Sequence, residues 1–223
     1  MSTIKLTAME NELNEKQLQI MDRALEVFAE KGFDNASVRD IAQRAEVNVA
    51  MISYYFGSKE KLLEAIFLNH TQSMKGKIES IIHSKVHDPL EKVDLLIDTY
   101  ITVIIENRSF HQLMMREQVL LKEGTLYTYI RDMKRQNRNL IEVAVKAGQK
   151  AGLFQKNIDV SMLAVSLIGT VNHFSSNYRF VCEENNVKPT EDGAYDPQSI
   201  EKLRTHIKVM FKAFLTYGIS SKK

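Results

Sequence analysis

Apolar residues recur at helical intervals along most of the chain, and this spacing is the feature that most restricts the possible folds. Segments 20–28, 90–104 and 200–215 each place apolar side chains three or four residues apart, which forms one face of an α-helix. No segment shows the sustained alternation that is typical of a strand. The 223 residues include only 9 Gly and 3 Pro, so few positions interrupt helices. We therefore predict an all-α protein of about nine helices.

Polar residues with capping chemistry mark where several of these helices begin. Asn14 with Gln17 and Ser37 with Asp40 have the spacing of capping boxes. Asn48 can cap a third helix, and Asp88 followed by proline is typical of an N-cap. A long fourth helix is expected to end near residue 84. Segment 161–181 is apolar nearly all round and predicts one buried helix, whereas residues 183–197 predict a loop.

Composition excludes several classes of protein. The chain is 44% hydrophobic with a net charge of +2, which excludes disorder over most of its length. Cys182 is the single cysteine, so a disulfide scaffold is excluded and a reducing cytoplasm is indicated. No apolar stretch approaches the roughly 18 residues of a membrane span, and residues 1–16 lack the apolar core of a secretory signal. We expect a cytoplasmic protein with no membrane partner.

Two very short helical segments, 38–45 and 49–56, are joined by about three residues. Each is shorter than the roughly 12–15 residues that an isolated helix needs, so the two must stabilise each other. The pairing is expected to bury six apolar side chains: Ile41, Ala42, Ala45, Val47, Ile52 and Phe56. Val27 and Phe28 of the first helix would complete the platform. This is the arrangement of a helix-turn-helix, whose second helix lies in the major groove of DNA.

The outward face of segment 49–56 carries side chains that can read DNA. Ala50, Ser53 and Tyr54 lie opposite Ile52 at about 100° per residue. Asn48 begins this helix, while Ser37 and Lys59 can reach the DNA backbone. The first 67 residues carry 8 Lys and Arg against 11 Asp and Glu. If these residues bind DNA, the local arrangement of their side chains must therefore provide the affinity, because their overall charge does not.

Residues from about Lys16 to Phe67 resemble the N-terminal domain of the TetR (tetracycline repressor) family of bacterial transcriptional regulators. The matching elements are Ala24-x-x-x-Phe28-x-x-x-Gly32-Phe33, Ser37-Val38-Arg39-Asp40-Ile41-Ala42, Ala45-Glu46-Val47-Asn48, and Ile52-Ser53-Tyr54-Tyr55-Phe56-Gly57-Ser58-Lys59-Glu60-Lys61-Leu62. The resemblance implies DNA contacts at Asn48, Val49, Ala50, Ser53, Tyr54, Tyr55 and Lys59, with Ser37 and Val38 near phosphate. Two positions depart from the family pattern. Glu46 replaces a glycine common in the turn, and Ser53 is smaller than is frequent there.

The resemblance implies a DNA-binding domain at residues 12–67 and a helical bundle at 68–223 that binds a small molecule and dimerises through its last two helices. Expected interface residues are Leu167, Val171, Tyr178, Leu203, Ile207, Met210 and Phe214. An apolar effector pocket is expected from Phe110, Met114, Met115, Tyr127, Tyr129, Met133 and Phe174. Ordinary helical core is the alternative for each pocket residue. The helix after Ser58 reaches both domains and could couple them.

We expect a ligand-responsive homodimeric regulator, a repressor in most of this family, that binds a palindromic double-stranded DNA operator and is released by a partly apolar small molecule. The alternative is a helical enzyme or carrier whose N-terminal unit is only structural. Nucleotide-binding and hydrolase motifs are missing from the sequence, so no enzyme activity and no cofactor are expected. His83 and His87 stand one helical turn apart, but no further ligand completes a set, so no metal site is expected.

Overall fold

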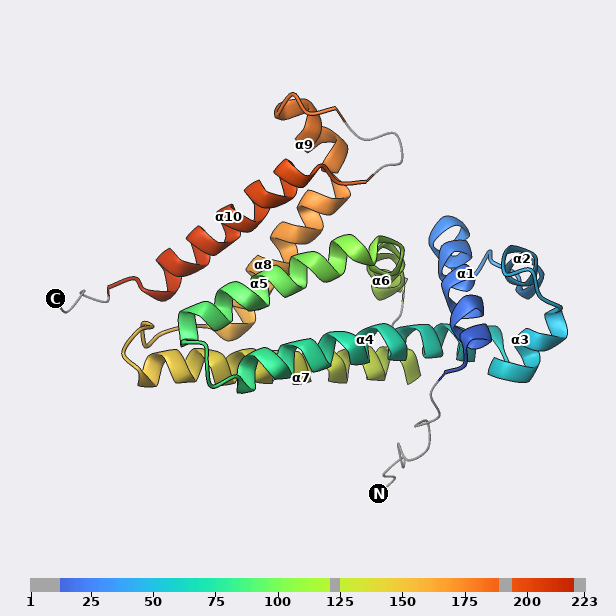
Figure 1. Ribbon diagram of the computed structural model, residues 1–223, viewed down its shortest axis with the longest axis horizontal. Helices are drawn as coiled ribbons and strands as arrows, with labels where there is room; N and C mark the ends of the chain where they lie inside the picture. The colour runs from blue at the N-terminus through green and yellow to red at the C-terminus, as the bar shows by residue number, and fades with distance from the viewer. Residues whose placement is uncertain (1–12, 121–124, 189–193, 219–223) are drawn as a thin grey trace, which may run out of the picture. The chain divides into compact units, whose positions relative to one another are not determined.

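The computed structural model describes the backbone of residues 13–120, 125–188 and 194–218, and the side chains of these residues except 117–120, 125, 126 and 129. Within these ranges the chain forms helices and no strand, which confirms the predicted all-α class (Figure 1). The helices are α1 Glu15–Lys31, α2 Val38–Arg44, α3 Val49–Phe56, α4 Lys59–His83, α5 Pro89–Glu106, α6 Arg108–Leu120, α7 Thr125–Lys150, α8 Val160–Ser176, α9 Tyr178–Glu184 and α10 Pro197–Leu215. None is long and apolar enough to cross a membrane.

The described ranges contain ten helices against the expected nine or so, and two of the boundaries lie at asparagines. Asn107 separates α5 from α6, and Asn177 separates α8 from α9. Each asparagine amide donates to the carbonyl of the residue four positions earlier, at 3.0 Å. Such side chain–backbone hydrogen bonds compete with the helical ladder. The predicted single helix over 161–181 is therefore two helices.

The predicted N-terminal caps are confirmed. Asn14 and Gln17 form a reciprocal capping box at α1, and Ser37 and Asp40 form one at α2. Asp88 caps α5 in front of a proline at the first turn. These local bonds satisfy backbone N–H groups that the first helical turn leaves free.

The chain divides into two compact units, each described by itself. The first comprises Met1–Gln72 and Arg108–Tyr127, and the second comprises Ser73–Asn107 and Thr128–Lys223. Helix α6 therefore groups with the N-terminal helices. Its Phe110 packs edge-on against Phe67 with ring centroids 5.1 Å apart, and it stacks on His70 at 4.3 Å. The chain crosses between the units within α4, at the break before α6, and within α7.

The core of the second unit joins α5, α8 and α10. Ile97 and Ile101 of α5 and Ile207 of α10 are almost fully buried there. On the rim of this core Asp98 accepts hydrogen bonds from Arg204 at 3.1 Å and Lys208 at 2.6 Å, which ties α5 to α10. Apolar burial thus holds α10 in place, and the ion pairs set its rotation.

Candidate nucleic-acid interface

The two short helices α2 and α3 pack as the sequence predicts. Ile41, Ala42 and Ala45 are buried on one side, and Ile52 and Phe56 are buried on the other. Val47 in the turn is half-buried. The platform residues Val27 and Phe28 of α1 are at most 1% exposed. This shared core gives stability to helices of seven and eight residues that would not persist alone.

Polar contacts fix α2 against α1. Arg44 makes a two-pronged pair with Glu30, at 3.0 and 2.8 Å. Lys31 pairs with Asp40 at 2.8 Å, and Gln19 donates its amide to the carbonyl of Ala45. The Lys31 ammonium, followed by the Ser37 hydroxyl, holds the pKa of the Asp40 carboxyl well below its ordinary value. These contacts orient the first helix of the motif.

The turn between α2 and α3 is closed by two backbone hydrogen bonds. The N–H of Glu46 donates to the carbonyl of Gln43 at 3.3 Å, and that of Val47 donates to Ala42 at 3.0 Å. This pairing is a Schellman motif, which requires a left-handed residue at its centre. Glu46 occupies that position with φ of 53°. The departure at Glu46 therefore falls where a side chain is sterically costly.

Helix α3 presents the predicted polar face to solvent. Ala50, Ser53 and Tyr54 are exposed, and the exposed fraction of Tyr54 reaches 83%. The Asn48 side chain caps the helix by accepting the N–H of Ala50 at 2.9 Å. Tyr55 is half-buried and packs edge-on against Tyr54, with ring centroids 5.1 Å apart. An exposed hydroxyl on a braced aromatic ring is suited to hydrogen bonding with base edges or phosphate.

Ser37 and Val38 lie at the start of α2, where phosphate contacts are expected. Both the N–H and the hydroxyl of Ser37 donate to Asp40, at 2.9 and 2.7 Å. A phosphate at this helix end would therefore compete with the Asp40 carboxylate for Ser37. Val38 is half-buried at the first position of the helix.

Lys59 has an internal role that the sequence reasoning missed. Its ammonium donates to the carbonyls of Phe33 and Ala36, at 2.8 and 2.9 Å, and lies 4.3 Å from the centroid of the Phe33 ring. The side chain thus ties the start of α4 to the connection between α1 and α2. One N–H direction of the ammonium remains for another acceptor. DNA contact by Lys59 stays a prediction.

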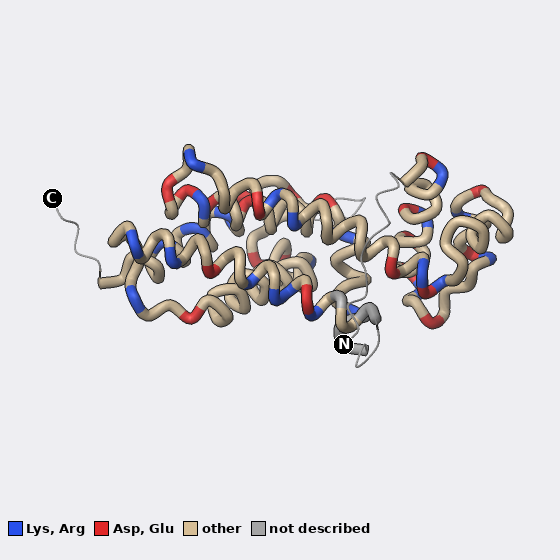
Figure 2. Tube along the Cα trace, turned by 90° about the horizontal axis from the view of Figure 1, so that it is seen from below, with Lys and Arg blue, Asp and Glu red and all other residues tan. Residues whose placement is uncertain are grey.

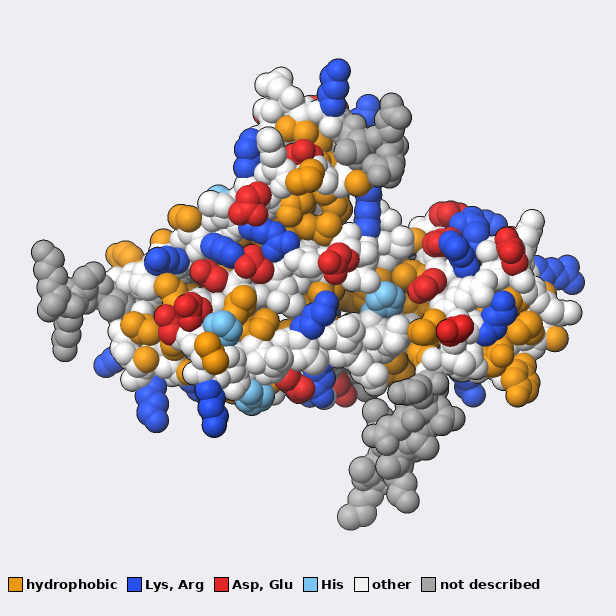
Figure 3. Space-filling view, in the orientation of Figure 1, with side chains coloured by type: hydrophobic (Ala, Val, Ile, Leu, Met, Phe, Trp, Pro, Cys, Tyr) orange, Lys and Arg blue, Asp and Glu red, His pale blue; other side chains and the backbone are white. Residues whose placement is uncertain are grey.

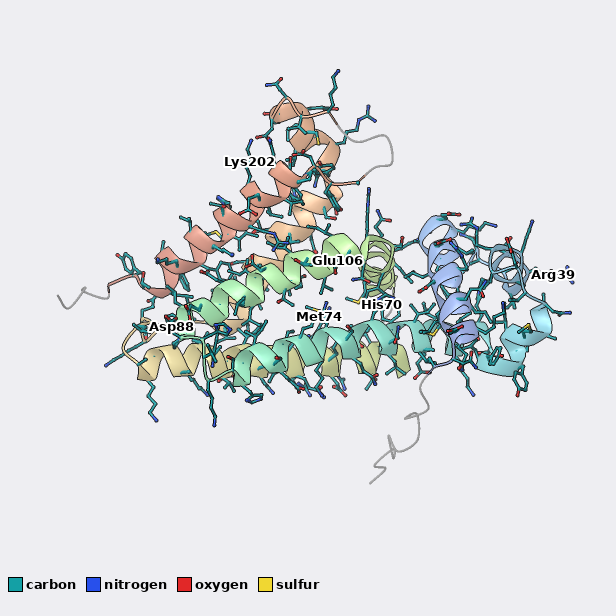
Figure 4. All side chains as sticks on the ribbon, viewed as in Figure 1. Arg39, His70, Met74, Asp88, Glu106 and Lys202 are labelled. Atoms are coloured by element: carbon teal, nitrogen blue, oxygen red, sulfur yellow. The ribbon has the colours of Figure 1, made fainter. Side chains whose placement is uncertain are left out.

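Arg39 is a further cation beside the predicted phosphate site. It lies on α2, and Figure 4 shows its side chain projecting away from the helices. Arg39 is exposed and makes no ion pair within the described ranges. Its position directly after Ser37-Val38 was the available sequence signal. Elsewhere on the first unit basic and acidic residues are interspersed along the trace (Figure 2).

The residues predicted to line an effector pocket fall in both units. Phe110, Met114 and Met115 are half-buried on α6, and Tyr127 is exposed. The side chain of Tyr129 lies outside the described residues. In the second unit Met133 is half-buried, as is Phe174, which contacts the rings of Tyr178 and Tyr195.

The residues predicted to form the dimer interface divide into two groups. Three of them are buried in the core of the second unit: Val171, Leu203 and Ile207. Tyr178 is buried against Tyr195, and Leu167 is half-buried and packs against the same core. Only Met210 and Phe214 are exposed. The large apolar residues exposed on α8 and α10 are Met162, Val165, Ile168, Val209, Met210 and Phe214. The most regular apolar stripe of each helix thus faces inward, where its side chains form the core of the unit.

Comparison with known proteins identifies both parts of the chain. Residues 20–66 match the family described as bacterial regulatory proteins, tetR family, and residues 86–179 match the tetracyclin repressor-like C-terminal domain. The HTH-type transcriptional repressor KstR2 of Rhodococcus jostii is 27% identical over 147 residues, which cover 66% of this chain and 72% of that protein. The fatty acid metabolism regulator protein of Bacillus subtilis is 26% identical over 159 residues, covering 70% and 80%.

Solved structures show the same fold. The ketosteroid transcriptional regulator KstR2 of Mycobacterium tuberculosis superimposes with a TM-score of 0.72 at 19% identity, covering 92% of this chain and 97% of that one. FadR of Bacillus subtilis, solved in complex with stearoyl-CoA, gives 0.63 at 21% identity and covers 89% and 98%. The helix-turn-helix geometry, the two family matches and these neighbours agree. The chain therefore belongs to the tetR family of bacterial transcriptional regulators.

Proposed function

We propose that this protein is a cytoplasmic homodimeric repressor that binds a palindromic operator through α3 of each protomer and leaves it when a small molecule binds the C-terminal helices. The observation that carries the proposal is the exposed face of Ala50, Ser53 and Tyr54 on a capped, braced α3. A helix of this kind fits the major groove, where side chains read base edges.

The proposed DNA contacts separate into two roles. Ser53 and Tyr54 contact base edges, with Ala50 allowing close approach. The flanking residues position α3 by contacting the DNA backbone; they are Asn48, Val49, Tyr55 and Lys59. Ser37, Val38 and Arg39 contact phosphate at the start of α2. Arg39 supplies an exposed positive charge there, although acidic residues outnumber basic ones in the first 67 residues.

We place the dimer interface on the exposed apolar side chains of α8 and α10. Val165 and Ile168 are 58% and 40% exposed, and Val209 and Phe214 are 63% and 45% exposed. Figure 3 also shows apolar side chains at the surface over the end where α8, α9 and α10 meet. Covering such a surface favours association. Two α3 helices related by a two-fold axis then read half-sites about 34–36 Å apart.

The effector proposed for this chain has a large apolar part, because two relatives are named for fatty acid metabolism and ketosteroids and one neighbour was solved with stearoyl-CoA. Half-buried Met133 and Phe174 can pack against an acyl chain or ring system. Because α4 and α7 each run through both units, a change in the second unit can reach the first along a continuous helix.

The test is a titration of the full chain against the DNA upstream of its own gene, with a shuffled duplex alongside, at several salt concentrations. We expect the native duplex to bind at least about a thousand times more tightly. Tyr54→Ala should remove this preference while helicity and oligomeric state stay unchanged. Stearoyl-CoA is then added to the complex and should release the DNA. Equal, steeply salt-dependent affinity for both duplexes would refute sequence-specific repression.

A further inference from the structure

Helix α7 carries one polar residue at a position where its pattern requires a core side chain. Ile130 lies two turns before Asn137 and Ala144 lies two turns after it, and both are buried. Their spacing of seven residues places all three on one face of the helix. The neighbouring Gln136 and Arg138 are exposed. Asn137 itself is half-buried, on the same face as these two core residues.

The side-chain oxygen of Asn137 is buried and accepts no hydrogen bond from any described group. A buried carbonyl without a donor is rare in folded proteins, because it loses its hydrogen bonds to water without replacement. A hydrophobic residue of similar size at this position would avoid that loss. Asn137 thus lowers the stability of the unliganded fold, which is typical of residues kept for binding.

The part of α7 that follows Asn137 packs among apolar and adaptable side chains. Helices α4 and α7 run in the same direction (Figure 1), and Ile78 and Ile82 of α4 pack against Ala144 with Leu140 alongside. One turn earlier on α4, Met74 packs against the same cluster from the side facing α5 (Figure 4). Unbranched methionine side chains repack easily around a bound molecule.

We propose that Asn137 is a specificity-determining residue of the effector site, and that the effector carries a hydrogen-bond donor, a hydroxyl or amide N–H, on an otherwise apolar body. The proposal rests on the proposed function, which places a small-molecule effector in the C-terminal helices. It adds how the effector is recognised. The effector donates a hydrogen bond to the buried side-chain oxygen of Asn137, whereas a ligand of the same shape without a donor leaves that oxygen without a hydrogen bond.

The first test measures stability without any ligand. Asn137→Leu should raise the thermal midpoint of the full chain by about 2–4 °C, because the substitution removes an unsatisfied buried oxygen. Gln136→Leu is the matched control, since the same change one residue away on the exposed face should leave the midpoint unchanged. A midpoint that falls, or does not change, in Asn137→Leu would show that the oxygen already has a partner such as a bound water. That result would overturn the proposal.

The second test measures donor preference directly by calorimetry. The probes are decan-1-ol and its isomer methyl nonyl ether, which has the same atoms but no O–H. The wild-type chain and Gln136→Leu should bind the alcohol about tenfold more tightly than the ether, and Asn137→Leu should bind the two equally. Equal binding by the wild type, binding of neither probe, or a preference that survives in Asn137→Leu would each overturn the proposal.

These outcomes are separate from those of the proposed function. If the alcohol preference depends on Asn137 but no operator is bound, the repressor function fails while the recognition role of Asn137 stands. If the operator is bound and stearoyl-CoA releases it, but Asn137→Leu responds like the wild type in both tests, the repressor stands and the role of Asn137 fails.

Discussion

Replacing Glu46 by glycine should stabilise the protein, because the turn between α2 and α3 holds this residue at φ of 53°. A side chain in the left-handed region costs about 1–2 kcal/mol. Glycine removes that cost but loses roughly 0.5–1 kcal/mol more backbone entropy on folding. The difference predicts a net gain of about 1 kcal/mol for Glu46→Gly, provided that both hydrogen bonds of the turn persist.

Other helix ends of this protein support the argument. Asn186 and Gly152 occupy the equivalent left-handed positions after α9 and α7, with φ of 54° and 72°. The same pair of backbone bonds closes each of these ends. Glycine and asparagine are the residues that tolerate this conformation best. Glu46 is thus the unusual occupant.

Urea unfolding of the wild type, Glu46→Gly and Glu46→Ala separates the backbone effect from the charge. The alanine variant removes the carboxylate but keeps a Cβ in the left-handed region, so its unfolding free energy should stay close to that of the wild type. Only the glycine variant should have a higher unfolding free energy than the wild type, and the dependence of that free energy on urea concentration should be unchanged. Equal gains in both variants, or no gain with glycine, would refute the argument from backbone strain.

The two variants should behave alike toward DNA. Each removes one negative charge beside α3, and at about 10 Å in water that charge repels a phosphate by roughly 0.4 kcal/mol, or about twofold in Kd. Operator affinity should therefore rise by a similar factor in both, and the gain should shrink as salt is added. A gain that appears only with glycine would instead indicate that the shape of the turn controls binding.

Three further predictions follow from contacts of the described residues. Lys59→Met should lower the unfolding free energy by about 2 kcal/mol in urea titrations, since two carbonyls lose a charged donor, whereas Lys61→Met at an exposed position should change little. Asp98→Asn should cost about 1–2 kcal/mol by the same measurement, because Arg204 keeps its charge on a largely covered surface; full stability would show that the pair contributes nothing. Val209→Glu should sediment as a monomer at micromolar concentration without loss of thermal stability, and a persistent dimer would place the interface elsewhere.

Local features of the sequence were enough to predict the helix-turn-helix. The caps at Asn14, Ser37 and Asp88 depend on residues within three positions, and the structure has all of them. The exposed face of α3 follows from helical geometry once Ile52 is assigned to the core. Such interactions are short in range, so the order of residues alone specifies them.

The helix count shows where short-range patterns failed. Nothing in hydrophobic spacing distinguishes Asn107 or Asn177 from an ordinary polar position on a helix. Each lies at the end of its helix, where its amide donates to a carbonyl one turn back. Asparagine at these positions permits a break, and the tertiary context decides whether the break occurs.

Only the tertiary structure decided which surface each apolar or charged side chain meets. Periodicity marked α8 and α10 as apolar, but the fold placed Val171 and Ile207 inside the unit and left Val209 and Phe214 at its surface. The ammonium of Lys59 bonds to carbonyls 26 and 23 residues earlier in the chain. The spacing of apolar residues indicates that one face of a helix is buried. Which side chains that face contacts depends on how elements far apart in sequence pack together, so only the folded chain determines those contacts.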